Sequence, residues 1–288
     1  MRVLVTGKNG QLGNSIHKIV TNNRQTNEFV FVGREVLDLG FSNNITDYFY
    51  HNNFDIIVNC AAYTAVDKAE EEQELANQIN HLAVKQLAEV SRKQKAKLIH
   101  VSTDYVFDGY SNKPYKETDE TNPINEYGKT KLAGEHAIQE VMLTNAVIIR
   151  TGGVYSEFGN NFLKTMLRIG RERDEINVVS DQICSTTYAT DLAEVILKLI
   201  DFQDNEKPTE IYHYANQGKV SWYDFSKQIF KSANIDCLTN SIKAIEYPTL
   251  ARRPQNSFMN NEKILKEIGV NSPFWKESLS ICIATLNK

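Results

Sequence analysis

A tyrosine and a lysine stand four residues apart in the stretch YGKTK, as Tyr127 and Lys131. Positions i and i+4 of a helix share a face, so on a helix both side chains point the same way. A phenol can protonate a carbonyl under reduction, and a neighbouring cation stabilises the phenolate and lowers the pKa of the phenol. Taken alone, the pattern is equally compatible with a surface helix on which the two residues happen to align.

A hydroxyl precedes this pair at the end of an apolar run. The stretch KLIHVST (97–103) has the character of a buried strand and ends at Ser102 and Thr103. Ligands of doubly wound sheets bind beyond the carboxyl ends of the strands, so Thr103 should reach the cleft. We predict three catalytic residues: Tyr127 as proton donor, Lys131 as its stabiliser and Thr103 as the hydrogen-bond donor that polarises the carbonyl.

The first strand ends in TGKNGQLG, which places Gly7, Gly10 and Gly13 at G-x-x-G-x-x-G spacing. The glycines follow a strand and open a helix, the context in which such a loop binds a dinucleotide. Backbone N–H groups then approach a pyrophosphate at the positive end of the helix. The predicted cofactor loop consists of Gly7, Gly10, Gln11, Leu12 and Gly13.

About 20 residues beyond such a loop, an NAD enzyme often carries an acidic residue for the ribose 2′-hydroxyl. This chain has Gly33 and Arg34 there. A guanidinium can pair with a 2′-phosphate, so NADPH is predicted, with NADH as the alternative. The alternative for Arg34 is a solvated loop cation. Asp38 and Leu39 are predicted, by analogy, to lie at the adenine.

Apolar runs alternate with longer amphipathic stretches, the pattern of βα units around a parallel sheet. It predicts an α/β fold, a Rossmann-type doubly wound parallel sheet, over residues 1–151, with later segments returning to it. The predicted strands are 2–6, 29–33, 55–61, 97–103 and 146–151, and the clearest predicted helices are 66–95 and 124–140.

After Thr151 the pattern loosens, and residues 152–288 are predicted to form mostly a smaller C-terminal substrate-binding lobe. Ser221 suits the N-cap of one of its helices. The predicted helices are 161–170, 189–201 and 221–233, the predicted strands are 176–182 and 211–216, and residues 234–275 are expected to be irregular.

Composition limits the partners. The net charge of −4 and the pI near 5.9 argue against nucleic acid or an anionic membrane surface. The sequence lacks an apolar run of the roughly 20 residues that a membrane helix needs, and its first residues lack the pattern of a signal peptide. Four scattered cysteines, without metal-ligand spacing, predict a cytoplasmic chain with no metal site.

Longer blocks carry a closer resemblance. The loop, Thr103 and YxxxK together resemble an extended short-chain dehydrogenase/reductase. Six blocks spread over the chain resemble the dTDP-4-dehydrorhamnose reductase family: VNCAAYTAVDKAE (58–70), STDYVFDG (102–109), YGKTKLAGE (127–135), GNNF (159–162), SWYDF (221–225) and RRPQNS (252–257). This resemblance implies NADPH-dependent reduction, at C4, of a dTDP-linked 4-keto-6-deoxy sugar to dTDP-L-rhamnose, for cell-surface polysaccharide.

The resemblance also implies further site residues and a homodimer. Lys131 would hold the nicotinamide ribose as well, and Arg253 is our candidate for the diphosphate, with a surface ion pair as its alternative. The implied cofactor residues are Ala61, Ala62 and Tyr63, and the implied sugar-nucleotide residues are Thr64, Asp104, Tyr105, Asn160 and Asn161. Related dehydratases have the sequence T-D-E after the same strand and use its two carboxylates for water elimination. This chain has Tyr105 at the third position, which favours reduction.

The chain departs from the family pattern at two places. Family members usually have a tryptophan after the fifth strand, where this chain reads Gly152-Gly153, so we expect a hole or a flexible turn beside the substrate. Cys184 replaces the small residues that usually follow DQ, and we interpret it as a small buried hydrophobe. The departures leave two alternatives open: a reductase of a different nucleotide-linked 4-keto sugar, or a non-catalytic NADP-binding regulatory subunit.

Overall fold

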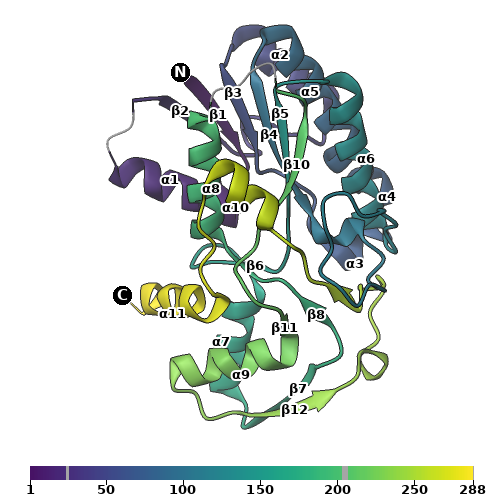
Figure 1. The fold of residues 1–288 in the computed structure, drawn as a ribbon, viewed down its shortest axis with the longest axis vertical. Coiled ribbons are helices and arrows are strands. Elements are labelled where there is room, and N and C mark those ends of the chain that lie inside the picture. Colours follow the sequence, from purple (N-terminus) through teal and green to yellow (C-terminus); the bar gives the residue numbers. More distant parts are fainter. Residues whose placement is uncertain (24–25, 203–206, 288) are drawn as a thin grey trace.

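The computed structural model describes residues 1–23, 26–202 and 207–287. Its centre is a six-stranded parallel sheet in the order β10-β5-β4-β3-β1-β2 (Figure 1). The strands are β1 (Arg2–Thr6), β2 (Glu28–Val32), β3 (Ile56–Asn59), β4 (Lys97–Thr103), β5 (Ala146–Thr151) and β10 (Glu210–His213). The five strands predicted in residues 1–151 are confirmed, with ends that shift by one or two residues. Apolar side chains of the inner strands are mostly buried on both faces, as continuous hydrophobic runs require, whereas in the edge strand β2 only Val32 is buried.

Helices cover both faces of this sheet, so the predicted doubly wound α/β fold is confirmed. Each face encloses its own apolar core. One face carries α1 (Gln11–Asn22), α8 (Ala189–Asp201) and α10 (Glu262–Ile268), and the other carries α2 (Ser42–His51), α5 (Ala83–Gln94) and α6 (Glu126–Val141). The strand order reverses between β1 and β3, and ligands of such sheets bind in the crevice at this reversal.

The predicted single helix 66–95 is wrong in detail. The structure has α3 (Val66–Ala69), a turn, α4 (Gln73–Asn77), a π-helical turn over Gln78–Leu82 and then α5. The π turn places Asn80 inward, where its amide binds the backbone N–H and the carbonyl of Tyr63. The helix is thus irregular at the place where Asn80 bonds to the loop after β3. The spacing of apolar residues in the sequence does not reveal such an irregular turn.

The C-terminal lobe has a core of its own, formed mainly by α7 (Phe162–Glu172), α9 (Trp222–Ala233) and α11 (Trp275–Leu286). Three small sets of paired strands accompany this core. They are β6 (Val154–Tyr155) with β9 (Thr187–Tyr188), β7 (Glu175–Val179) with β12 (Leu238–Ile242), and β8 (Ile183–Cys184) between β11 (Val220–Ser221) and β13 (Asn256–Ser257). The pair at the far end of this core from the sheet is that of β7 and β12 (Figure 1).

Three expectations for this half need correction. The strand predicted at 176–182 ends at Val179, the strand predicted at 211–216 ends at His213, and the irregular segment 234–275 contains β12, β13 and α10. β12 escapes prediction because its sequence, LTNSI, is largely polar and pairs only with β7. Ser221 is confirmed as an N-cap, since its hydroxyl accepts a hydrogen bond from the Asp224 N–H at 3.0 Å.

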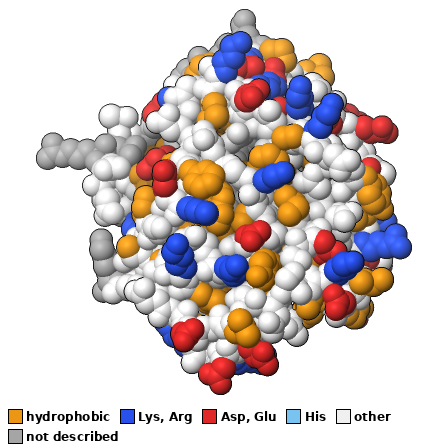
Figure 2. All heavy atoms as spheres, turned by 60° about the horizontal axis from the view of Figure 1, so that its bottom comes forward, with side chains coloured by type: hydrophobic (Ala, Val, Ile, Leu, Met, Phe, Trp, Pro, Cys, Tyr) orange, Lys and Arg blue, Asp and Glu red, His pale blue; other side chains and the backbone are white. Residues whose placement is uncertain are grey.

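The surface in Figure 2 mixes both signs of charge, with apolar side chains between them. This intermixing of acidic and basic side chains is consistent with the small net charge of −4. Across the described ranges, no helix combines the length and apolarity needed to cross a membrane.

Candidate active site

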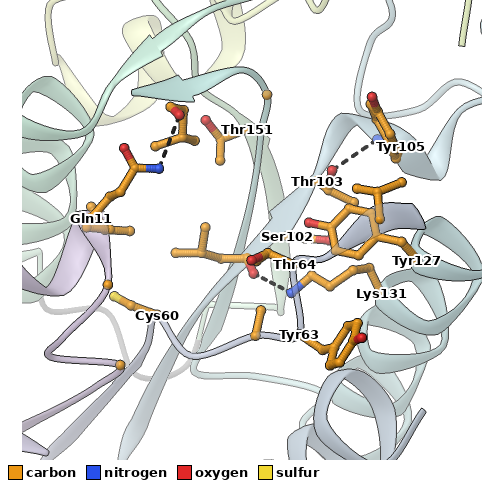
Figure 3. Close-up of a pocket in the computed structure, with 18 of the residues that line it drawn as sticks. Gln11, Cys60, Tyr63, Thr64, Ser102, Thr103, Tyr105, Tyr127, Lys131 and Thr151 are labelled. Carbon is orange, nitrogen blue, oxygen red and sulfur yellow. Dashed lines mark hydrogen bonds between the residues drawn. The ribbon is translucent and has the colours of Figure 1, made fainter. Parts of the chain in front are cut away.

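A cleft of about 880 Å³ lies at the carboxyl ends of the sheet strands, between the sheet and the C-terminal lobe (Figure 3). All the site residues predicted from the sequence line it, except Gly13 and Arg253. The sequence therefore locates one contiguous site, although its residues come from positions 7 to 257 of the chain.

The glycine loop begins the cleft and leads into α1. Gly13 packs directly onto it, since a Cβ there would lie 2.3 Å from the Gly7 carbonyl oxygen. Gly10 is the N-cap of α1 and provides no side-chain cap, so the first-turn amides of the helix remain for a ligand. This arrangement fits the pyrophosphate of a dinucleotide.

Arg34 and Asp38 lie together at one end of the cleft. Arg34 Nε donates to Asp38 Oδ2 at 3.0 Å, while most of the arginine side chain remains exposed. Asp38 also accepts hydrogen bonds from its own loop, at the Gly40 N–H. The guanidinium is thus held loosely at the cleft, and its contact with a 2′-phosphate remains a prediction.

The paired phenol and amine of α6 are confirmed as neighbours on one helical face, both directed into the cleft (Figure 3). The helix begins where Asn125 accepts a hydrogen bond from the Gly128 N–H. A Cβ at Gly128 would lie 2.2 Å from the Tyr105 carbonyl, so glycine lets the helix approach the end of β4. This close approach places Tyr127 beside Thr103.

Burial raises the pKa of Tyr127 to about 12, while a hydrogen bond with Thr103 acts in the opposite direction. The pKa of Tyr127 is thus raised, and the expected lowering by Lys131 is not seen. A phenol that keeps its proton at neutral pH still suits a proton donor.

Thr103 makes two local hydrogen bonds at the end of β4. Its hydroxyl donates to Asp104 Oδ1 at 3.1 Å and accepts from the Tyr105 N–H at 3.2 Å. Burial raises the pKa of Asp104 to about 6. A substrate carbonyl must therefore compete with the Asp104 carboxylate for the Thr103 proton.

Lys131 is almost completely buried. Its Nζ donates to the Val101 carbonyl at 2.7 Å and lies 3.3 Å from His100 Nε2. Burial lowers the pKa of Lys131 to about 8. His100 was not among the predicted residues, although a polar residue inside the apolar run KLIHVST was a usable signal.

The loop after β3 brings Ala61, Ala62, Tyr63 and Thr64 to the cleft, as the resemblance implied. The Ala61 N–H donates to Asn59 Oδ1 at 3.2 Å, and the Tyr63 hydroxyl donates to Glu72 at 2.7 Å. These bonds fix the loop without using the cleft.

Asn160 is exposed at the cleft, whereas the side chain of Asn161 is used within the protein. Asn161 accepts from the Lys164 N–H as the N-cap of α7, and its Nδ2 donates to Gln11 Oε1 at 2.9 Å. Asn161 is therefore a link between the glycine loop and the lobe, and any contact with a sugar nucleotide remains a prediction.

Arg253 forms a two-pronged ion pair with Asp67, at 3.1 and 2.6 Å, and does not line the cleft. In this structure Arg253 therefore takes part in an ion pair, the alternative given for it in the sequence analysis. The positive charge of Arg253 lowers the pKa of Tyr105, a residue that lines the cleft, so Arg253 lies near the cleft. Its contact with a diphosphate remains a prediction.

The Gly152-Gly153 turn is packed, so the expectation of a hole or a loose turn needs correction. Gly153 has a φ of +53°, and a Cβ there would lie 2.7 Å from the Ser185 carbonyl oxygen. At Gly152 a Cβ would lie 2.5 Å from Asp104 Oδ2. Protein atoms thus occupy the space beside both glycines.

The lining residues that were not assigned from the sequence include Trp222 of α9, Ser257 of β13 and Cys60 after β3. Trp222 stacks at a tilt on Phe162, with ring centroids 4.6 Å apart. Its block, SWYDF, was noted as a whole without assigning a role to the indole. Cys184 also lines the cleft and is buried, as expected. Within the described part of the chain, no cluster of His, Cys, Asp and Glu could hold a metal ion.

Comparisons with known proteins agree with this geometry. The model of a family described as the RmlD substrate binding domain matches residues 1–288. A dTDP-4-dehydrorhamnose reductase of Aggregatibacter actinomycetemcomitans is 40% identical over an alignment of 298 positions, gaps included. The alignment covers 96% of this chain and 97% of the relative.

Solved structures show the same likeness. A dTDP-4-dehydrorhamnose reductase from Clostridium acetobutylicum superposes with a TM-score of 0.94 at 38% identity, over 100% of both chains. A dTDP-4-dehydrorhamnose reductase from Bacillus anthracis, in complex with NADP, gives a TM-score of 0.92 at 37% identity, over 99% of both chains.

Proposed function

This chain belongs to the dTDP-4-dehydrorhamnose reductase family, and we propose that it reduces the C4 ketone of dTDP-4-dehydro-6-deoxy-L-mannose to give dTDP-L-rhamnose. NADPH, when bound, supplies the hydride. The observation that supports this most is the convergence of Thr103, Tyr127 and Lys131 at the cleft that the glycine loop opens.

The residues present fit NADPH. The uncapped start of α1 would hold the pyrophosphate, Arg34 the 2′-phosphate and Lys131 a ribose hydroxyl. Position 34 carries a cation rather than a carboxylate, and the neighbouring carboxylate of Glu35 is paired with Lys8 at 2.7 Å.

The chain contributes an acid and a polarising donor to the reaction. Tyr127 holds its proton at neutral pH and gives it to the oxygen of the reduced carbonyl. Thr103 turns its hydroxyl from Asp104 to that oxygen and stabilises the developing charge. Lys131, in its ammonium form, stabilises the phenolate that remains.

The sugar nucleotide occupies the side of the cleft toward the C-terminal lobe. Thr64, Tyr105 and Asn160 line the cleft and would hold the sugar nucleotide, and Arg253 would take a diphosphate oxygen once it leaves Asp67. The chain works in the cytoplasm as a homodimer, in nucleotide-sugar synthesis for surface polysaccharide.

One observation favours a second candidate, a reductase of another nucleotide-linked 4-keto sugar. The Gly152-Gly153 turn replaces an aromatic side chain beside the predicted sugar position, so the preferred sugar can differ.

The deciding experiment follows the loss of NADPH absorbance with dTDP-4-keto-6-deoxy-L-lyxo-hexose generated in situ, with the product identified by mass and NMR. Rapid oxidation that yields dTDP-L-rhamnose supports the proposal. Oxidation with only another keto sugar supports the second candidate, and tight NADPH binding without any turnover points to a regulatory subunit.

A further inference from the structure

Behind Lys131, a line of buried polar side chains crosses three neighbouring strands of the sheet. His100 of β4 lies 3.3 Å from Lys131 Nζ through its Nε2, and its Nδ1 lies 3.0 Å from Asn59 Nδ2 of β3. Asn59 Oδ1 in turn accepts a hydrogen bond of 2.6 Å from Thr6 of β1. All four side chains are at most 2% exposed, so water does not compete for these contacts.

The donors in this line determine where the proton of His100 resides. A backbone N–H only donates, and the Ala61 N–H is shared between Asn59 Oδ1 at 3.2 Å and Thr6 Oγ1 at 3.3 Å, so the end of the amide that it faces is the oxygen. The NH₂ end of Asn59 therefore faces His100 and requires Nδ1 as its acceptor. A neutral imidazole with an accepting Nδ1 carries its proton on Nε2. Burial keeps the pKa of His100 well below its usual value, so the ring is neutral.

The Nε2–H of His100 thus points at Lys131 Nζ. A hydrogen bond across this 3.3 Å contact forms only with a neutral amine, which has a lone pair, because an ammonium would oppose one N–H with another. The second contact of Nζ, to the Val101 carbonyl, accepts either form of the lysine.

We propose that His100 is a positioning residue for the reduction: held in one tautomer by Asn59, it favours the neutral amine of Lys131 over the ammonium. This inference rests on the proposed function, in which the ammonium stabilises the Tyr127 phenolate. The fraction of enzyme in the ammonium form, and with it the activity, then depends on pH near neutrality.

Other titratable groups face Lys131 from the surrounding elements. Glu135, one turn further along α6, and the Cys60 thiol after β3 both favour the ammonium, whereas burial opposes it. Glu135 is itself paired with Arg150 of β5 at 2.7 Å. Tyr127 is protonated at neutral pH. Together these influences leave the pKa of Lys131 at about 8.

The test measures the tautomer of His100 and the titration of Lys131 in the NADPH complex. Long-range ¹H–¹⁵N NMR of labelled histidine should show a neutral ring with its proton on Nε2. The midpoint of Lys131 follows from ¹³C-labelled lysine, with the signal assigned by its loss in Lys131→Arg. His100→Phe keeps a ring but removes the N–H, so the midpoint and the alkaline limb of kcat/KM should rise by roughly one pH unit.

Asn59→Asp provides the sharper variant, because a carboxylate requires a proton on His100 Nδ1 and turns Nε2 into an acceptor for the ammonium. It should also raise the midpoint. Thr6→Val is the matched control, since the Ala61 N–H still orients Asn59, and its midpoint should equal that of the unchanged protein. A proton on Nδ1 in the unchanged protein, or an unaltered midpoint in both His100→Phe and Asn59→Asp, would overturn the inference.

Failure of the proposed function gives a different result. A protein that reduces no keto sugar still has a histidine tautomer and a lysine midpoint, and these two NMR measurements decide the inference without any turnover.

Discussion

Gln11 of the glycine loop and Asn161 at the start of α7 are joined by a hydrogen bond of 2.9 Å, from Asn161 Nδ2 to Gln11 Oε1. Gln11 also donates to the Val154 carbonyl at 3.2 Å and accepts from the Ser156 hydroxyl at 3.0 Å. The position of the cofactor loop is therefore tied to the first helix of the substrate lobe.

Replacing Asn161 with alanine removes this link and the N-cap of α7 together. We expect a loss of about 1–2 kcal/mol in the free energy of unfolding, because several hydrogen bonds of one side chain are lost with the cap. Asn160→Ala is the matched control, since Asn160 is exposed, and its unfolding should be unchanged. Chemical denaturation of both variants measures the difference, and equal stability would contradict the assignment of Asn161 as the link.

Tyr127→Phe keeps the aromatic ring and removes the proton donor. We expect turnover to fall by roughly 10²–10⁴-fold, the range for loss of a general acid. NADPH affinity should stay nearly unchanged, because the ring still fills its place. Steady-state kinetics and cofactor titration measure the two effects separately, and full activity in this variant would exclude Tyr127 as the donor.

Arg34→Ala removes the guanidinium that we assign to the 2′-phosphate. We expect NADPH to bind roughly tenfold more weakly, with NADH affected much less, since only NADPH carries that phosphate. Arg168→Ala removes an exposed arginine that is paired with Glu172 at the same i, i+4 spacing, does not line the cleft, and serves as the control for charge alone. Titration of each variant with both cofactors gives the ratio, and equal losses for NADPH and NADH would rule out the contact.

The buried carboxyl of Asp104 should make stability depend on pH. Its pKa is about 6 in the folded chain and near 3.8 in a model compound, so the folded chain binds the proton more tightly than the unfolded chain does. Stability is therefore lost as the pH rises from about 4 to about 6, by up to about 3 kcal/mol.

Asp104→Asn cannot ionise and should escape this loss. Denaturation at both pH values gives the free energy of unfolding of the variant minus that of the unchanged protein. This difference should be more positive at pH 7.5 than at pH 4. The exposed Asp47, changed to asparagine in the same way, is the matched control. If the difference in free energy of unfolding between the Asp104 variant and the unchanged protein does not depend on pH, burial does not destabilise the ionised Asp104 carboxylate.

Gly153→Ala tests the packed turn beside the substrate site. Both Gly153 and Gly159 have a positive φ, but only at Gly153 would a Cβ meet a backbone atom closer than 3 Å. We expect Gly159→Ala to cost about 1 kcal/mol and Gly153→Ala clearly more, in thermal or chemical unfolding. Equal costs would show that the Ser185 carbonyl moves away easily.

The sequence predicted the three residues that meet at the cleft because their signals are local. Tyr127 and Lys131 are one helical turn apart, and Thr103 ends a long apolar strand. The glycine loop is equally local, since it joins one strand to one helix. Each signal needs only a few neighbouring residues to be recognised.

The contacts that escaped prediction depend on packing between distant segments. Asn80 enters the core through a π turn that periodicity does not show, and Asn161 bonds to a residue 150 positions earlier. Arg253 was assigned from its chemistry, but its guanidinium pairs with Asp67, 186 positions earlier. Trp222 and Ser257 reach the cleft only because the lobe folds against the sheet.

The position of β10 has a consequence for synthesis on the ribosome. This strand pairs with β5, yet its residues are translated about 60 positions later. Until they emerge, β5 is an open edge, a site where another nascent chain could pair. Ser257 of β13 lines the cleft, so the glycine loop is synthesised long before the last residues that line the cleft. Slow translation between residues 151 and 210 should therefore promote aggregation more than slow translation after residue 213.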